Sequence, residues 1–206
     1  FAKQPRYQGA GSSMVNPHTL TDILTELPSY PIHCVGYAQG YDRIGHRNDQ
    51  LVEEALSISQ QADIILVCIG LDEVNEVEGH DRTNMGLPGN QVELLKELSK
   101  TGKTMIAVLS CGSAIEMPWV SLCQGIVHGY LGGQAGAKAM LGVLTGAVNP
   151  SGRLNESYPL SYKDCPSAAY YPGQQLTSEY REGIYVGYRY YDKVDKRVLY
   201  PFGYGL

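Results

Sequence analysis

Two continuous apolar runs constrain the fold of this 206-residue chain more than any other feature. Residues 64–69 and 105–109 lack the apolar–polar alternation of a strand with one wet face, so both predict strands buried on both faces, as in a parallel sheet. Between them, the segment that opens at residues 87–90 has the apolar spacing of a helix and ends at residues 101–102. This order predicts an α/β fold with a mostly parallel β-sheet flanked by helices on both faces.

Further elements extend this pattern. Residues 48–61 predict a helix capped by Asn48 or Asp49, and residues 134–144 predict a helix of small residues. The short apolar run at residues 32–35 predicts an additional strand, and residues 125–130 are a further candidate. Because a chain of this length supports one well-buried core, we expect a single domain over residues 1–206.

The last part of the chain has a different composition. Eleven of the 16 tyrosines lie after residue 150, among Pro, Gly and short polar runs. Tyr combines an apolar ring with a polar hydroxyl, which suits a wet surface or an interface. We therefore interpret residues 150–206 as an extended tail that packs on the domain and leads to a following module, with a ligand platform as the alternative.

Charge and hydropathy exclude two classes of partner. Sixteen basic and 21 acidic residues give a formal net charge of −5, and no basic stripe occurs, so we expect no nucleic-acid partner. No apolar run approaches the roughly 18 residues of a membrane span. Residues 1–31 also lack the basic start and apolar stretch of a signal peptide. The chain is therefore expected to act away from membranes.

The cysteines indicate a reducing compartment. None of the five forms a C-x-x-C pair, and Cys34, Cys68 and Cys111 lie in or beside apolar runs, where they are expected to be buried thiols. We therefore expect a cytoplasmic location, which leaves open a signal peptide upstream of Phe1. No His, Cys or Asp spacing suits a metal, and no cofactor is implied.

The loop after the first buried run is the leading candidate for chemistry, because ligands bind beyond the carboxyl ends of strands in open parallel sheets. Residues 71–82 read LDEVNEVEGHDR, with five carboxylates within ten residues. Crowded carboxylates raise one another's pKa, as a general acid working near neutral pH requires. A solvated acidic loop is the alternative. We expect Asp81 and Arg82 to form an ion pair that pins the loop, Arg82 to orient a catalytic carboxylate, and His80 to face solvent.

Two glycine-rich segments are weaker candidates. QGAGSS at residues 8–13 allows close approach of a polar ligand but lacks the spacing of a dinucleotide fingerprint. GGQAG at residues 132–136 could hold an anion at a helix start, although close packing of that helix on the sheet explains it better. No nucleophile elbow or phosphate loop occurs, and Cys111 is expected to be a structural thiol.

Five segments, in this order, resemble the C-terminal α/β sandwich domain of glycoside hydrolase family 3, the β-glucosidase type. They are RYQGAGSS at residues 6–13, EVEGHDR at 76–82, LPGNQ at 87–91, GGQAG at 132–136 with NPSGRL at 149–154, and EGIYVGYRYY at 182–191 with PFGYGL at 201–206. Together they cover essentially the whole chain.

The resemblance implies one half of a retaining β-glycosidase that hydrolyses terminal β-linked glucosides or oligosaccharides. A barrel domain, in the same or a partner chain and absent from these 206 residues, would carry the nucleophile and most sugar contacts. A strand preceding Phe1 would join the sheet. This domain would supply the acid/base glutamate, which is Glu78 or else Glu76, with Ser12, Ser13 and Arg82 as substrate-binding candidates. A non-catalytic carbohydrate-binding or interaction module is the alternative function.

Overall fold

The computed structural model describes residues 1–173 and 176–206, and the chain divides into two compact units. The first unit comprises Phe1–Arg82, Leu87–Ser113 and Trp119–Asn149. The second comprises Thr83–Gly86, Ala114–Pro118 and Pro150–Leu206. The acidic loop and both glycine-rich segments belong to the first unit.

A three-stranded parallel sheet forms the centre of the first unit. Its strands β1 (Ile64–Gly70), β2 (Thr104–Ser110) and β3 (Gly125–His128) lie in the order β1-β2-β3. The register pairs Gly70 with Ser110, and Leu109 with His128. The carboxyl ends of all three strands therefore meet at one edge of the sheet, where the acidic loop begins. The predicted parallel sheet is confirmed.

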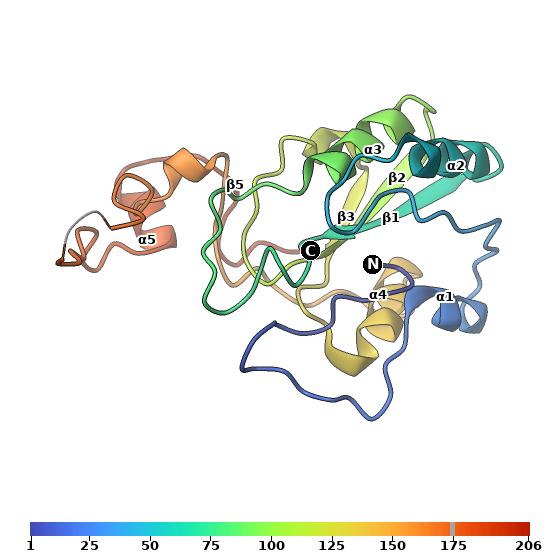
Figure 1. The fold of residues 1–206 in the computed structure, drawn as a ribbon, viewed down its shortest axis with the longest axis horizontal. Helices are drawn as coiled ribbons and strands as arrows, with labels where there is room; N and C mark the ends of the chain where they lie inside the picture. Colours follow the sequence, from blue (N-terminus) through green and yellow to red (C-terminus); the bar gives the residue numbers. More distant parts are fainter. Residues whose placement is uncertain (174–175) are drawn as a thin grey trace. The chain divides into compact units, whose positions relative to one another are not determined.

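Helices cover both faces of this sheet (Figure 1), as the apolar strands predict. Helices α2 (Asp49–Ser59) and α3 (Gly89–Ser99) lie on one face, and α1 (Ile23–Glu26) and α4 (Gly136–Leu144) on the other. Cys68 and Val108 pack with residues of α1 and α4 in one cluster. Side chains alternate along a strand, so the fully buried Ile69 and Leu109 face α2 and α3 instead. Short 3-10 turns accompany these elements: η1 (Leu27–Ser29), η2 (Val120–Leu122) and η3 (Gly133–Ala135).

Helix α3 is joined to the end of β1 by a buried amide. The Gln91 side chain is 1% exposed, accepts a hydrogen bond from the Gly70 N–H at 2.9 Å and donates one to the Gly70 carbonyl at 2.9 Å. Both backbone groups of the last residue of β1 are therefore paired by one side chain.

In the described ranges, no helix is long and apolar enough to cross a bilayer.

The predicted strand at residues 32–35 is wrong. These residues form no strand, Ile32 and Val35 are each 41% exposed, and Cys34 is an exposed thiol rather than a buried one. Cys68 and Cys111 are buried, as expected. Residues 32–35 line a cavity of about 590 Å³ together with residues of β1. Since no strand in the described part of the chain pairs with them, three apolar residues and a histidine are not enough to make a strand there.

The second unit has a small core of its own, in which tyrosines are prominent. Strand β4 (Tyr158–Pro159) pairs antiparallel with β5 (Val198–Tyr200). The fully buried Tyr158 meets Tyr200 edge-on, with ring centroids 6.4 Å apart. The 3-10 turn η4 (Tyr162–Asp164) and helix α5 (Tyr188–Lys193) complete this unit. The packing of residues 150–206 over the sheet domain stays a prediction.

Candidate active site

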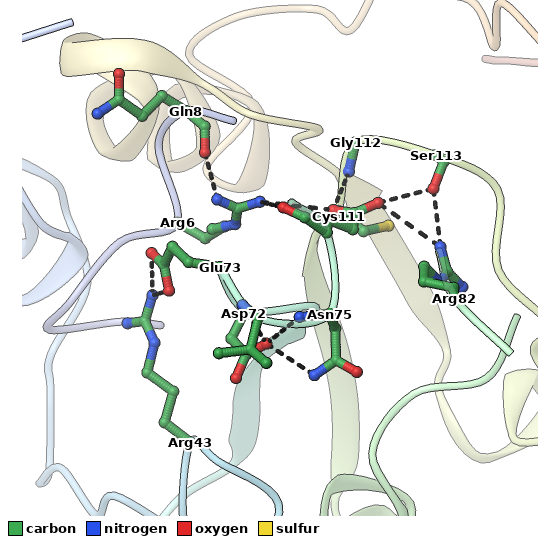
Figure 2. A network of polar contacts seen from close by, with 12 residues as sticks. Arg6, Gln8, Arg43, Asp72, Glu73, Asn75, Arg82, Cys111, Gly112 and Ser113 are labelled. Atoms are coloured by element: carbon green, nitrogen blue, oxygen red, sulfur yellow. Dashed lines mark hydrogen bonds and ion pairs between the residues drawn. The ribbon is translucent and has the colours of Figure 1, made fainter. Parts of the chain in front are cut away.

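The acidic loop leaves β1 through a turn that a buried carboxylate stabilises. Asp72 is only 4% exposed, and its Oδ1 accepts hydrogen bonds from the backbone N–H of Val74 at 3.1 Å and of Asn75 at 2.8 Å. The side-chain amide of Asn75 donates to the same oxygen at 2.7 Å (Figure 2). An Asp that pairs with backbone groups two and three residues on is a typical turn former. The direction of the loop is therefore set as it leaves the sheet.

Glu76 lies on the inner side of this loop, and both of its carboxylate oxygens are in use. Its side chain is 12% exposed. Oε2 accepts from the backbone N–H of Gly112 at 2.8 Å, and Oε1 accepts from the Ser113 hydroxyl at 2.7 Å. Both donors follow the end of β2, so Glu76 joins the loop to the neighbouring strand.

Two arginines converge on the same carboxylate. The buried Arg6 lies with its Nη2 4.0 Å from Glu76 Oε2, and the same nitrogen donates to the Glu76 carbonyl at 2.9 Å. Arg82 lies 3.7 Å from Glu76 Oε1 through its Nη1, which also donates to the Ser113 hydroxyl at 2.9 Å (Figure 2). The predicted Asp81–Arg82 ion pair is not formed within the described residues. Arg82 does orient a carboxylate, but the carboxylate is that of Glu76.

Glu78 has the opposite environment. Its side chain is exposed, and its Oε2 accepts from the backbone N–H of Ser12 at 2.7 Å. Hydrogen bonds from the Ser12 hydroxyl and then from this N–H lower the pKa of the Glu78 carboxyl below its usual value. The loop is also paired there with the glycine-rich segment, because the Glu78 N–H donates to the Ala10 carbonyl at 3.3 Å.

The glycine in this segment is required by the close approach of Glu78. Gly11 has a φ of +98°, which disfavours residues with a side chain, and a Cβ built on it would lie 2.6 Å from the Glu78 Cβ. The predicted candidates Ser12 and Ser13 are both exposed, and Ser12 is the one in contact with Glu78. The structure therefore brings Ser12 and Glu78 together on the outside of the loop, and Arg82 and Glu76 together on its inside.

Sequence reasoning missed three of the residues that contact Glu76, namely Arg6, Gly112 and Ser113. Arg6 belongs to the first segment of the family resemblance, but the sequence assigns it no role, and Gly112 and Ser113 belong to none of the candidate segments. Their positions before and after the acidic loop gave no signal that they would meet in one network. His80 is exposed, as predicted. No group of three His, Cys, Asp or Glu in the described ranges could hold a metal ion.

His128, at the end of β3, is a half-buried titratable group near Glu76. Its Nδ1 accepts from the Tyr130 N–H at 3.2 Å, and its Nε2 lies 3.9 Å from the Cys111 Sγ. The imidazole stacks on the Tyr130 ring with centroids 3.8 Å apart. Burial lowers the pKa of His128 to about 4. The imidazole is therefore neutral at neutral pH.

We expect the stability of the domain to fall as the pH drops from about 6.5 to 4. Below pH 6.5 the unfolded chain binds a proton at His128 that the folded state binds only near pH 4, so stability present at neutral pH is lost across this range. A pKa lowered by about 2.5 corresponds to about 3 kcal/mol. Urea unfolding at pH 7.5 and pH 4.5 measures this loss. His128→Asn, whose side-chain oxygen can accept from the Tyr130 N–H, should show a smaller loss; an equal loss would contradict the assignment.

Comparison with known proteins decides the family of this chain. The sequence pattern of the Glycosyl hydrolase family 3 C-terminal domain matches residues 1–206. The chain belongs to this family. It is 41% identical to the thermostable β-glucosidase B of Acetivibrio thermocellus and 40% identical to an exo-α-(1→6)-L-arabinopyranosidase of Bifidobacterium longum, over its whole length. The chain spans 28% and 27% of these two relatives.

Solved structures agree with this family 3 assignment. The crystal structure of a family 3 β-glucosidase from Bifidobacterium adolescentis matches the whole chain with a TM-score of 0.94 and 41% identity. The chain corresponds to 30% of that protein. A β-glucosidase from Streptomyces venezuelae in complex with D-glucose matches 77% of the chain and has 20% of its own length covered, with a TM-score of 0.71 and 38% identity. The predicted α/β fold and the family resemblance are both confirmed.

Proposed function

We propose that this family 3 domain supplies Glu78 as the acid/base of a retaining β-glycosidase. The carrying observation is the contrast between two carboxylates two residues apart. Both oxygens of Glu76 are bound inside the loop, whereas Glu78 lies exposed at its outer side, where its carboxylate accepts hydrogen bonds from Ser12. A group that protonates a substrate oxygen must be accessible to the substrate, and Glu78 meets this condition.

The proposed reaction proceeds in two steps. In the first step, a carboxylate on a barrel domain attacks the anomeric carbon, the glycosidic C–O bond breaks, and the Glu78 carboxylic acid gives its proton to the departing oxygen. In the second step, the Glu78 carboxylate takes a proton from water as that water displaces the enzyme carboxylate. The sugar is released and Glu78 is again protonated.

For Glu78 to act as an acid, its pKa must be raised by the partner domain. In this chain, the hydroxyl and N–H of Ser12 lower the pKa of Glu78, which suits the base of the second step and not the acid of the first. A barrel carboxylate nearby and the exclusion of water would both raise that pKa. The domain is therefore proposed to acquire its acid only when the barrel covers the loop. The Ser12 N–H remains available to hold the carboxylate that forms.

We propose that contacts outside this domain mainly determine which sugar is bound. The proposed substrate class is a β-linked glucoside or oligosaccharide. Two relatives of nearly equal identity to this chain, 41% and 40%, carry the names of a β-glucosidase and an α-L-arabinopyranosidase. Similarity within this domain therefore does not separate the two sugars. Ser12, Ser13 and Arg82 stay candidates for substrate contact.

The test is hydrolysis of a panel of aryl β-glycosides by three preparations. They are this chain alone, a family 3 barrel domain alone, and a polypeptide that joins the two, called the joined enzyme below. We expect turnover by the joined enzyme only. Turnover by this chain alone would place the nucleophile within the 206 residues and refute the half-site. An inactive joined enzyme whose sugar binding survives changes to Glu76 and Glu78 would favour a binding module.

A further inference from the structure

The inner carboxylate of the acidic loop has no part in the reaction proposed above, yet it is the most highly connected group in the loop. Glu76 accepts from Gly112 and Ser113 at 2.8 and 2.7 Å, and lies within 4.0 Å of both Arg6 and Arg82. Glu73, another carboxylate of this loop, is half exposed, and among the described residues its ion pair is with Arg43, at 2.7 Å. A purely solvated loop would not need a buried cluster of this kind.

We propose that Glu76 is the positioning residue of this site, whose contacts with Gly112, Ser113, Arg6 and Arg82 hold the loop so that Glu78 meets the substrate oxygen. This inference rests on the proposed role of Glu78. The two residues are separated only by Val77, which forms a bridge with Ala10. Any movement of Glu76 away from the end of β2 therefore moves the backbone that carries Glu78.

The arginines make this arrangement sensitive to the charge of Glu76. Arg6 is 2% exposed, and the Arg82 side chain is 20% exposed. Arg6 Nε and Arg82 Nη2 are buried and have no hydrogen-bond partner among the residues that the structure describes. If Glu76 became a neutral amide, two poorly hydrated cations would face each other across the cluster without a counter-charge. The loop would then relieve this repulsion by leaving β2.

Glu76→Gln in the joined enzyme tests the proposal. We expect kcat/KM to fall on the order of 10²-fold for glycosides with poor leaving groups, as for a misplaced catalytic group, and only a few-fold for activated aryl glycosides. Added azide should not restore activity to Glu76→Ala, because the acid/base itself is still present. Glu73→Gln is the matched control, with the same change in the same loop, and should alter kcat/KM less than two-fold.

A milder variant covers the case in which Glu76→Gln does not fold. Ser113→Ala removes the hydroxyl that contacts both Glu76 and Arg82, and should reproduce the leaving-group dependence with a smaller loss. Equal slowing of all substrates would mean a structural role only, and unchanged kinetics would remove any role; both overturn the proposal. Azide rescue of Glu76→Ala would make Glu76 itself the acid/base. If Glu78→Ala instead lacks both azide rescue and leaving-group dependence, the proposed function fails, whatever Glu76 does.

Discussion

Replacing Glu78 with Gln in the joined enzyme should lower kcat/KM roughly 10²–10⁴-fold for glycosides with poor leaving groups, the range that general acid catalysis contributes. Dinitrophenyl glycosides should be cleaved with nearly unchanged kcat/KM, because their leaving oxygen departs without a proton. Their kcat should still fall, since the second step has lost its base. The measurement is kcat/KM plotted against the pKa of the leaving phenol.

Azide separates the loss of the acid/base from a general loss of structure. Glu78→Ala should be accelerated by azide with activated substrates, because this anion attacks the sugar without giving up a proton and fits the space that the side chain leaves. The product should be a glycosyl azide of retained configuration. Asp81→Asn, an exposed carboxylate in the same loop, is the matched control and should behave as the unmodified enzyme. A Glu78 variant that slows all leaving groups equally would rule out the assignment.

Sequence reasoning predicted well those elements whose local residue pattern is sufficient to identify them. β1 and β2 are continuous apolar runs, and such a run is buried in a parallel sheet whatever lies further along the chain. Residues 32–35 are also apolar, apart from His33. A strand needs a hydrogen-bonded neighbour, however, and whether one is present depends on parts of the chain far from these four residues. The same limitation explains the exposed Cys34, which was assigned to that strand.

The roles of the two glutamates could not be separated in this way. Glu76 and Glu78 have the same chemistry and adjacent places in one motif, and the resemblance left both open. What distinguishes Glu76 is a hydrogen bond that its carboxylate accepts from the N–H of Gly112, 36 residues later, and one that its carbonyl accepts from Arg6, 70 residues earlier. The first contact depends on the parallel register of β1 and β2, and the second on the N-terminal residues of the chain running alongside the loop. The local sequence around the two glutamates indicates neither contact.

The Asp81–Arg82 prediction failed for a related reason. Neighbouring side chains in an irregular loop need not point the same way, so adjacency in sequence is weak evidence for an ion pair. Arg82 instead meets a carboxylate and a hydroxyl that are already held in place by the end of β2. A preorganised pair of acceptors costs less side-chain entropy to bind than an exposed neighbour does.

The same end of β1 that starts the acidic loop should be intolerant of any side chain. A Cβ built on Gly70 would lie 1.9 Å from the Ser110 carbonyl oxygen and 2.7 Å from its carbon, so it meets backbone and not a movable side chain. Gly70 cannot retreat without losing its two hydrogen bonds to Gln91. Strain of 1–3 kcal/mol and two hydrogen bonds of about 1 kcal/mol each predict that Gly70→Ala destabilises the domain by roughly 3–5 kcal/mol.

Urea unfolding of Gly70→Ala against Gly102→Ala measures this effect. Gly102 has a positive φ of +70°, but a Cβ there would meet nothing within 4 Å, so its substitution should cost only about 1–2 kcal/mol of backbone strain. The difference between the two variants therefore isolates the clash with Ser110. Because Ser110 is two residues before Gly112, the clash would also displace the donors that hold Glu76. Gly70→Ala should then lose activity on poor leaving groups even where it remains folded, whereas equal stability of the two variants would show that β1 and β2 can separate at this end.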